Sequence, residues 1–310
     1  MLHDKHVIQT WLVYTATFIV LSLLMSNAAN AQITRDVGSI AVIEGDNSAI
    51  FMSGRCQSVN TTGVARKFYQ THADEFHTLI IFTTLSGCEQ TATPYHEWVL
   101  QSTKGIGRPF FDHRVPYGSS RAGALEGVVN MHNIDRYFRP GAGSAFPTLA
   151  QEFEHRWAAF VTFDCDPGPQ VSSCDSLLGR DEIHWSFFFH TAAVTSTETV
   201  QNTSSMEGNF WLINSPTPGK FQTTGFVYGY SRLDLYLMGL LSADEVGPFW
   251  FISDPHNVIP PNTRESAPGD NGTVADGTQT FVTIQDIIRV FPEIPTSHPV
   301  IISFAKHSSS

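Results

Sequence analysis

The segment 147–163 constrains the fold of this chain more than any other. Its apolar residues recur at spacings of four and three, which is the period of an α-helix: Leu149, Phe153, Trp157 and Phe160. The preceding stretch, 140–144, is rich in glycine and ends at Ser144, a suitable N-cap. We therefore predict a helix over 147–163 that packs one apolar face against the rest of the protein.

The polar residues of this helix form a variant of the H-E-x-x-H motif. In the intact motif two histidines one turn apart bind Zn²⁺, and the glutamate between them activates the metal-bound water. Here Glu152 and His155 occupy the general-base and second-ligand positions, but Gln151 stands at the first ligand position. A neutral amide is a much poorer zinc donor than imidazole. Taken alone, so short a motif more often marks the solvated face of an ordinary helix.

The N-terminus has the layout of a secretory signal peptide. An apolar run over 11–25 follows a short polar segment with Lys5, and small residues up to Ala31 form a cleavage pattern. The run is short for a membrane anchor. We expect residues 1–31 to be removed and a secreted or periplasmic protein, residues 32–310, that does not insert in a membrane.

The cysteines agree with export, because an even number in an exported chain indicates disulfides. Three pairings are possible among the four residues. We favour the pairing in which each bond closes a compact segment, Cys56 with Cys88 and Cys165 with Cys174. A cysteine zinc site is disfavoured because no C-x-x-C spacing occurs.

Charge limits the class of partner. The net charge of -11, with no basic run, argues against nucleic acid and against anionic membrane surfaces. The chain offers no nucleophile elbow for a serine hydrolase, since 118–123 lacks the G-x-S-x-G spacing. The expected partner is a peptide or protein.

The rest of the chain predicts a mixture of strands and helices. Strands are predicted within 33–54 and over 76–84 and 124–131, and an aromatic segment follows at 184–190. Further helices are predicted at 231–241 and 283–290. The stretches 164–179 and 254–278, rich in Asp, Gly and Pro, are predicted to be loops.

With these residues in place, the chain resembles secreted bacterial zinc-metallopeptidase-like proteins of the zincin or metzincin type. The resemblance rests on His155-Arg156-Trp157, on His184-Trp185, and on the segment 230–240, which contains Asp234-Leu235-Tyr236-Leu237-Met238-Gly239-Leu240. It runs from about residue 76 to residue 246. It implies a single zincin-like α+β domain in which a mixed β-sheet packs on the active-site helix.

The resemblance also implies roles for individual residues. His155 and His184 would be zinc ligands, Glu152 the general base, Asp234 a supporting residue and Met238 a methionine turn beneath the metal. An ordinary core methionine and a buried, hydrogen-bonded histidine explain Met238 and His184 about as well. Because Gln151 departs from the pattern, a metal site would need a further ligand: His190, Glu154 or Asp234. Glu154 is more easily explained as an exposed carboxylate.

Two functions follow. The first is zinc-dependent hydrolysis of peptide bonds, in which Glu152 takes a proton from the bound water and passes it to the leaving amine. The second is an inactive pseudopeptidase that still binds extended peptide or protein segments by strand addition.

Overall fold

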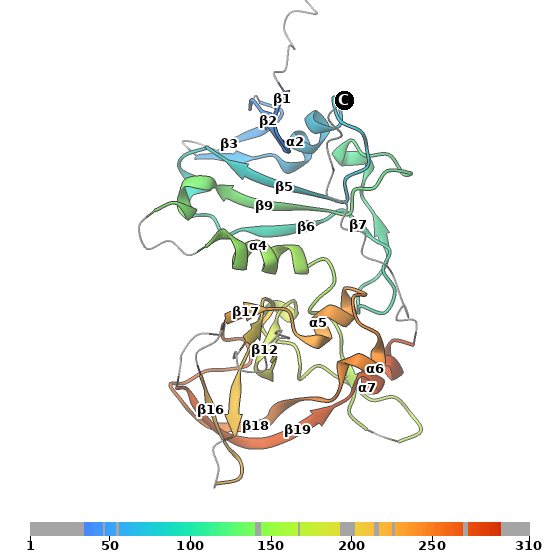
Figure 1. Ribbon diagram of the computed structural model, residues 1–310, viewed down its shortest axis with the longest axis vertical. Coiled ribbons are helices and arrows are strands. Elements are labelled where there is room, and N and C mark those ends of the chain that lie inside the picture. The colour runs from blue at the N-terminus through green and yellow to red at the C-terminus, as the bar shows by residue number, and fades with distance from the viewer. Residues whose placement is uncertain are drawn as a thin grey trace, which may run out of the picture.

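The computed structural model describes residues 34–45, 47–53, 56–139, 144–166, 168–192, 202–213, 217–224, 227–268 and 272–292. The fold is α+β, as predicted, with an N-terminal half up to the end of α4 (Ala145–Glu154) and a C-terminal half after it (Figure 1). The predicted signal peptide lies outside the described residues. Within them, no helix is long and apolar enough to cross a membrane.

A three-stranded mixed sheet forms the centre of the N-terminal half. Its middle strand, β9 (Gly127–Asn133), is buried along its whole length. It pairs parallel with β5 (Thr78–Thr83) and antiparallel with β6 (Tyr95–Trp98). The strands predicted at 76–84 and 124–131 are therefore present. The expectation that the first is buried throughout is wrong, because β5 lies at the sheet edge and Ile80 and Phe82 are exposed.

Smaller elements surround this sheet. Helix α2 (Thr61–Phe68) packs its Ala65 into the core with Val128 of β9, and Asn60 caps it by accepting from the Gly63 amide. The remaining elements are β1 (Thr34–Val37), β2 (Ile40–Ile43), β3 (Ile50–Ser53), β4 (Cys56–Val59), α3 (Cys88–Thr91), β7 (Leu100–Gln101), β8 (Phe111–Asp112), η1 (Val115–Tyr117) and η2 (Ile134–Tyr137).

Helix α4 has the predicted N-cap, Ser144, begins at Ala145, two residues before the predicted segment, and ends early. The Ser144 side chain accepts from the Phe146 amide, but the helix stops at Glu154 instead of continuing to 163. Beyond it the amides of Trp157 and Ala158 both bond to the Glu154 carbonyl, and the chain turns into the core of the C-terminal half, where Ala158 is fully buried. Tertiary burial of 158–163 thus overrides the helical period of the sequence.

The C-terminal half contains a curled eight-stranded sheet, below α4 in Figure 1. Its spatial order is β15 (Trp211–Ile213), β16 (Lys220–Thr223), β19 (Val274–Val282), β18 (Phe249–Ile259), β12 (Trp185–His190), β14 (Glu207–Asn209), β13 (Asn202–Ser204) and β17 (Val227–Gly229).

Two strands of this sheet correct the prediction that 254–278 is a loop. Strand β18 extends to Ile259 and β19 starts at Val274, so the connection is only 260–273. The turn-forming residues are accommodated by irregular pairing between Ser253 and Ile259, where Asp254 and Asn257 have positive φ. Because bulges accommodate these residues, a strand forms in a segment whose composition favours a loop.

The helices of this half lie together at one end of the sheet (Figure 1). Helices α5 (Arg232–Leu237) and α7 (Ile284–Val290) fall within the predicted segments 231–241 and 283–290, and α6 (Ala243–Val246) lies between them. Buried residues of α5 and α7, including Leu233 and Ile287, share one core cluster with Trp185 and Phe189. The remaining elements are β10 (Phe163–Asp164), β11 (Ser173–Cys174) and η3 (Arg180–Glu182).

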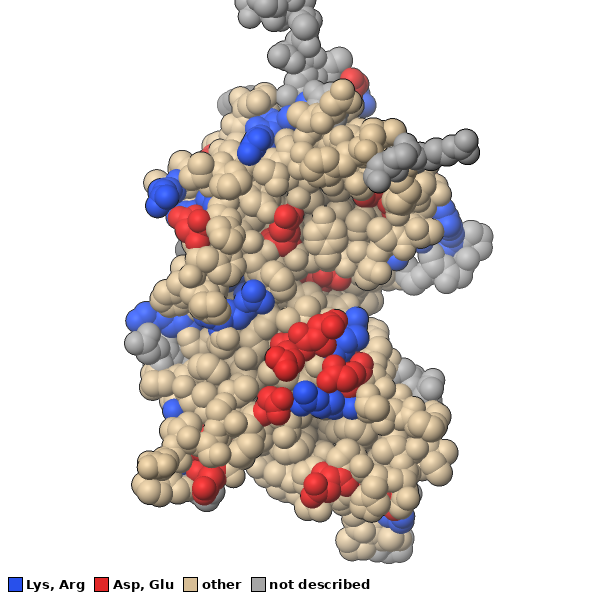
Figure 2. Space-filling view, turned by 180° about the vertical axis from the view of Figure 1, so that it is seen from behind, with Lys and Arg blue, Asp and Glu red and all other residues tan. Residues whose placement is uncertain are grey.

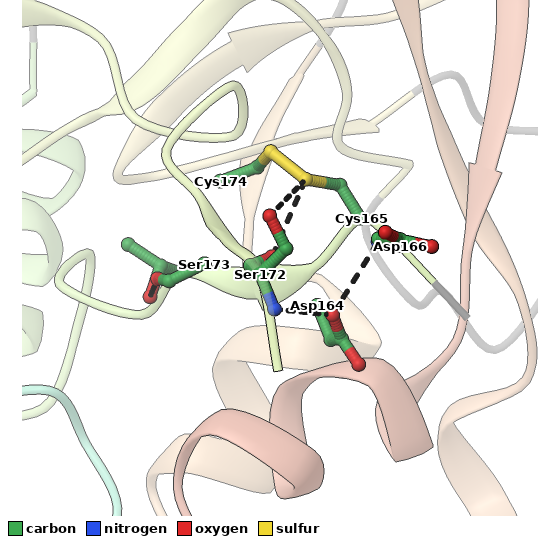
Figure 3. Close-up of a disulfide and its surroundings, with 7 residues drawn as sticks. Asp164, Cys165, Asp166, Ser172, Ser173 and Cys174 are labelled. Atoms are coloured by element: carbon green, nitrogen blue, oxygen red, sulfur yellow. Dashed lines mark hydrogen bonds between the residues drawn. A yellow bond between two sulfur atoms is a disulfide. The ribbon is translucent and has the colours of Figure 1, made fainter. Parts of the chain in front are cut away.

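Both favoured disulfide pairings are present, as expected for an exported protein. Cys56–Cys88 joins β4 to α3, and Cys165–Cys174 closes a short loop after α4 (Figure 3). In this loop the Asp164 carboxylate accepts hydrogen bonds from the amides of Asp166 and Ser172. The predicted loop 164–179 is therefore a stapled structure with a short β10–β11 pair.

Candidate functional site

The structure brings Gln151, Glu152, His155 and His184 to the boundary between the two halves. The first two lie on the last turns of α4, His155 caps its C-terminus, and His184 immediately precedes β12. The His155 and His184 rings meet edge to face with their centroids 4.9 Å apart, and each residue is 5% exposed. The sequence prediction that these residues belong together agrees with this arrangement.

Arg180, which the sequence analysis did not single out, enters the same site. The His184 Nδ1 lies 3.0 Å from the Arg180 carbonyl, which places the ring proton on Nδ1 and leaves the Nε2 lone pair to accept. The guanidinium Nη2 of Arg180 lies 3.1 Å from that Nε2. The Nε2 atom through which His184 would bind a metal thus already accepts a hydrogen bond from the Arg180 cation.

Glu207 completes this cluster from β14. Its Oε1 pairs with the Arg180 guanidinium and accepts a long hydrogen bond, 3.5 Å, from the Gln151 amide. The same carboxylate oxygen lies 3.9 Å from His184 Nε2. Gln151 therefore acts as a donor to a carboxylate, and the Arg180 charge is balanced by Glu207.

Close packing of the loop before β12 fixes the position of Arg180. Gly179 allows the approach, because a Cβ there would lie 2.6 Å from the Arg264 carbonyl and 2.8 Å from Ser186 Cα. The next turn places Asp181 and Glu182 at positive φ, and the Gly179 amide closes it by donating to the His184 carbonyl. Glu207 also has a positive φ, 76°, so both new members of the site stand in or beside unusual backbone.

Burial sets the protonation of the site. Desolvation raises the pKa of Glu152 to about 8, opposed by a hydrogen bond from the His96 backbone and, to a smaller extent, by the charge of Arg180. Desolvation and the neighbouring His184 lower the pKa of His155 to about 2, and burial also lowers the pKa of His184. At neutral pH the site therefore holds a largely protonated Glu152, two neutral histidines and the Arg180–Glu207 ion pair. A protonated Glu152 carboxyl is able to donate a hydrogen bond and is not ready to act as a base.

These groups do not fit a zinc ion. Within the described ranges, no three His, Cys, Asp or Glu side chains converge as ligands for a metal. Gln151 directs its amide N–H at Glu207, and Arg180 brings a positive charge to His184 Nε2 and Glu207. A cation beside these donors opposes binding of a second cation. We therefore derive no step through a metal.

The possible replacement ligands named from the sequence lie elsewhere. His190 accepts from the Trp211 amide through Nδ1 and stacks on Trp250. Glu154 is not an exposed carboxylate, as the sequence suggested, but is fully buried beside Asp234. Asp234 accepts from the Trp185 indole at 2.7 Å and caps α5 through the Ser231 amide.

The two supporting residues have different places. Asp234 is linked to the site through Trp185, the neighbour of His184, and through Glu154, the neighbour of His155. Met238 is the buried C-cap residue of α5, and its amide donates to the Asp234 carbonyl. The role of a methionine turn beneath a metal stays a prediction for Met238.

The sequence carried only a weak signal for Arg180 and Glu207. Arg180 stands four residues before His184, and Glu207 is followed by a glycine. Neither belongs to a periodic pattern. Only the fold, which joins η3, β14 and α4, places the two charges beside the motif.

No match to this chain was found among protein-family models, curated proteins or solved structures. The site is therefore interpreted from its own geometry.

Proposed function

We propose that this protein is an exported pseudopeptidase: a zincin-like scaffold that binds extended peptide segments without metal and without cleaving them. The observation that carries this proposal is the contact of the Arg180 guanidinium with His184 Nε2 and Glu207, which gives the site a permanent cation. Gln151 supports it, since its amide donates to the same carboxylate.

The position of β6 supports peptide binding. It is an edge strand of the mixed sheet, and two of its side chains anchor it to the end of α4. His96 Nδ1 donates to the Glu152 carbonyl at 2.8 Å, and the Trp98 indole donates to the His155 carbonyl at 2.6 Å. An extended segment paired with this strand would therefore run beside the site.

The electrostatics of the site suit a peptide carbonyl. Arg180 keeps a side chain that is 41% exposed, and protonated Glu152 is a second donor in its field. A carbonyl oxygen accepts from both kinds of group. Hydrolysis would instead need an activated water and an ionised base, which this arrangement disfavours.

The test measures metal content and peptide binding on the same purified protein. We expect substoichiometric zinc by mass spectrometry, and binding of fluorescein-labelled denatured casein, without cleavage, that EDTA does not change. Arg180→Ala should weaken binding, whereas Arg264→Ala should not. Arg264 is a matched control, because it is equally exposed and, among the described residues, its ion pairs are with Asp175 and Glu265. Stoichiometric zinc with EDTA-sensitive cleavage of casein would establish the peptidase instead.

A further inference from the structure

A hollow of about 330 Å³ lies where the two halves meet, away from Arg180 and Glu207. The N-terminal half contributes the loop 104–110 and the C-terminal half contributes the end of α7 and the residues after it. The lining residues are Lys104, Gly105, Arg108, Pro109, Phe110, Val290, Phe291 and Pro292. Among the described residues that line it, the hollow thus has apolar walls and two basic residues, and none of them is acidic.

Arg108 is the notable member of this lining. Its guanidinium carbon lies 4.1 Å from the centre of the Trp98 ring and 4.7 Å from that of Phe160. Its Nε is buried and has no hydrogen-bond partner within the described part of the chain, and burial lowers the pKa of the guanidinium. Because the chain has a net charge of -11, a half-buried arginine would be expected to pair with a carboxylate. The Arg108 guanidinium instead contacts two aromatic rings.

The loop that presents Arg108 is tightly held. Ile106 is 1% exposed in the main core cluster, and Gly107 packs so closely on the Phe160 carbonyl that a Cβ would lie 2.3 Å from its oxygen. Gly107 also has a positive φ of 81°. The cation is therefore held in place before a ligand arrives, which lowers the entropic cost of binding.

Figure 2 shows Lys and Arg side chains gathered at one side of the waist between the two halves, with Asp and Glu clustered below. Trp98 joins the hollow to the candidate site, since it contacts Arg108 of the lining through its ring and the His155 carbonyl through its indole N–H. A segment that follows β6 beyond Trp98 would reach the hollow.

We propose that the hollow binds a carboxylate attached to an apolar group, such as the C-terminal residue of a bound peptide. Arg108 and Lys104 supply the charge for the carboxylate, and Phe110, Val290 and Phe291 supply the apolar contact. The identity of the ligand as a peptide end rests on the proposed function, but binding of the carboxylate does not.

The test compares two small probes that differ only in charge, N-acetyl-phenylalanine and N-acetyl-phenylalanine amide, by titration calorimetry on the full protein. We expect the acid to bind about tenfold more tightly than the amide at low salt, with the difference reduced at high salt. Arg108→Gln should remove the difference. Lys104→Gln, at an exposed position, should reduce it by about twofold to threefold.

Equal binding of acid and amide, or an unchanged preference in both variants, would overturn the proposal. If Arg108→Gln fails to fold, the proposal is still tested by the comparison of acid and amide on the wild type and by Lys104→Gln. The source of the carboxylate is tested with a labelled pentapeptide ending in phenylalanine, as free acid or amide. If the ligand is a peptide end, the acid should bind more tightly than the amide, and Arg180→Ala should also weaken binding of the acid. If the ligand is a free aromatic acid, the pentapeptide should not bind. Acid-selective binding without any binding of casein would leave this site standing and remove the proposed function.

Discussion

The Arg180 guanidinium donates to His184 Nε2 across 3.1 Å, while the carbonyl of the same arginine lies 3.0 Å from His184 Nδ1. One residue therefore fixes both nitrogens of the ring. This contact defines the tautomer of a histidine that the sequence marks as a zinc ligand, and it places a permanent positive charge where a metal would be needed. It also means that Gln151 is only part of the reason for expecting a metal-free site.

The first prediction concerns restoration of a metal site. Gln151→His alone should leave the protein with substoichiometric zinc, because Arg180 still contacts His184 and Glu207. Gln151→His combined with Arg180→Ala should bind about one zinc ion per chain, since three ligands are then free of the guanidinium. Metal analysis after dialysis against zinc measures both, and His155→Ala in the double variant serves as control. A full equivalent of zinc in the single variant would show that Arg180 does not compete.

The second prediction concerns the pH dependence of stability. Glu154 is fully buried, and burial together with Asp234 raises its pKa well above the ordinary value of 4.5. The folded protein thus retains a proton that the unfolded chain releases above about pH 4.5, so this group's contribution to stability is complete below that pH and declines as the pH rises.

Glu154→Gln places an amide N–H beside Asp234, so the donor no longer depends on protonation of a carboxyl group. Relative to the wild type, the variant should therefore gain stability as the pH rises from 5 to 7, by at most about 1.4 kcal/mol per pH unit. Urea unfolding at pH 5, 6 and 7 measures this difference. A constant difference across these values would mean that Glu154 does not hold the proton.

The third prediction concerns the buried hydrogen bond from Trp185 to Asp234. Trp185→Phe removes the donor 2.7 Å from the Asp234 carboxylate, and both residues are fully buried. Loss of a hydrogen bond to a buried charged group costs about 1.5–3 kcal/mol, in addition to the lost packing. Trp211→Phe is the matched control, because its indole donates to the neutral Phe187 carbonyl. Equal losses in urea unfolding would assign the whole effect to packing.

The fourth prediction concerns the two disulfides. Cys56–Cys88 spans 32 residues and Cys165–Cys174 spans 9. In the chain-entropy description, the longer loop should contribute about 1 kcal/mol more to stability. Paired Cys→Ala variants, unfolded thermally and in urea under non-reducing conditions, measure this. The order would be reversed if the short loop, which also carries the Asp164 contacts to Asp166 and Ser172, loses its structure when its disulfide is removed.

Local patterns in the sequence determined several features of this protein. The breaker before Ser144 and the helical period predicted the start of α4, and the spacing of the cysteines favoured the two pairings that are present. Runs of β-branched and apolar residues predicted β5 and β9. These features depend on interactions between residues near in sequence, or on side chains with one dominant chemistry.

The tertiary structure alone decided where α4 ends, whether Glu154 is exposed, and what faces His184. Helix α4 stops at Glu154 because burial of the following alanines in the core of the C-terminal half stabilises the protein more than another helical turn would. Glu154 is buried because α5 brings Asp234 against it. Arg180 and Glu207 reach the site through turns with positive φ, from segments that show no periodicity. Sequence therefore determined the residues of the motif, and long-range packing determined the charges that surround it.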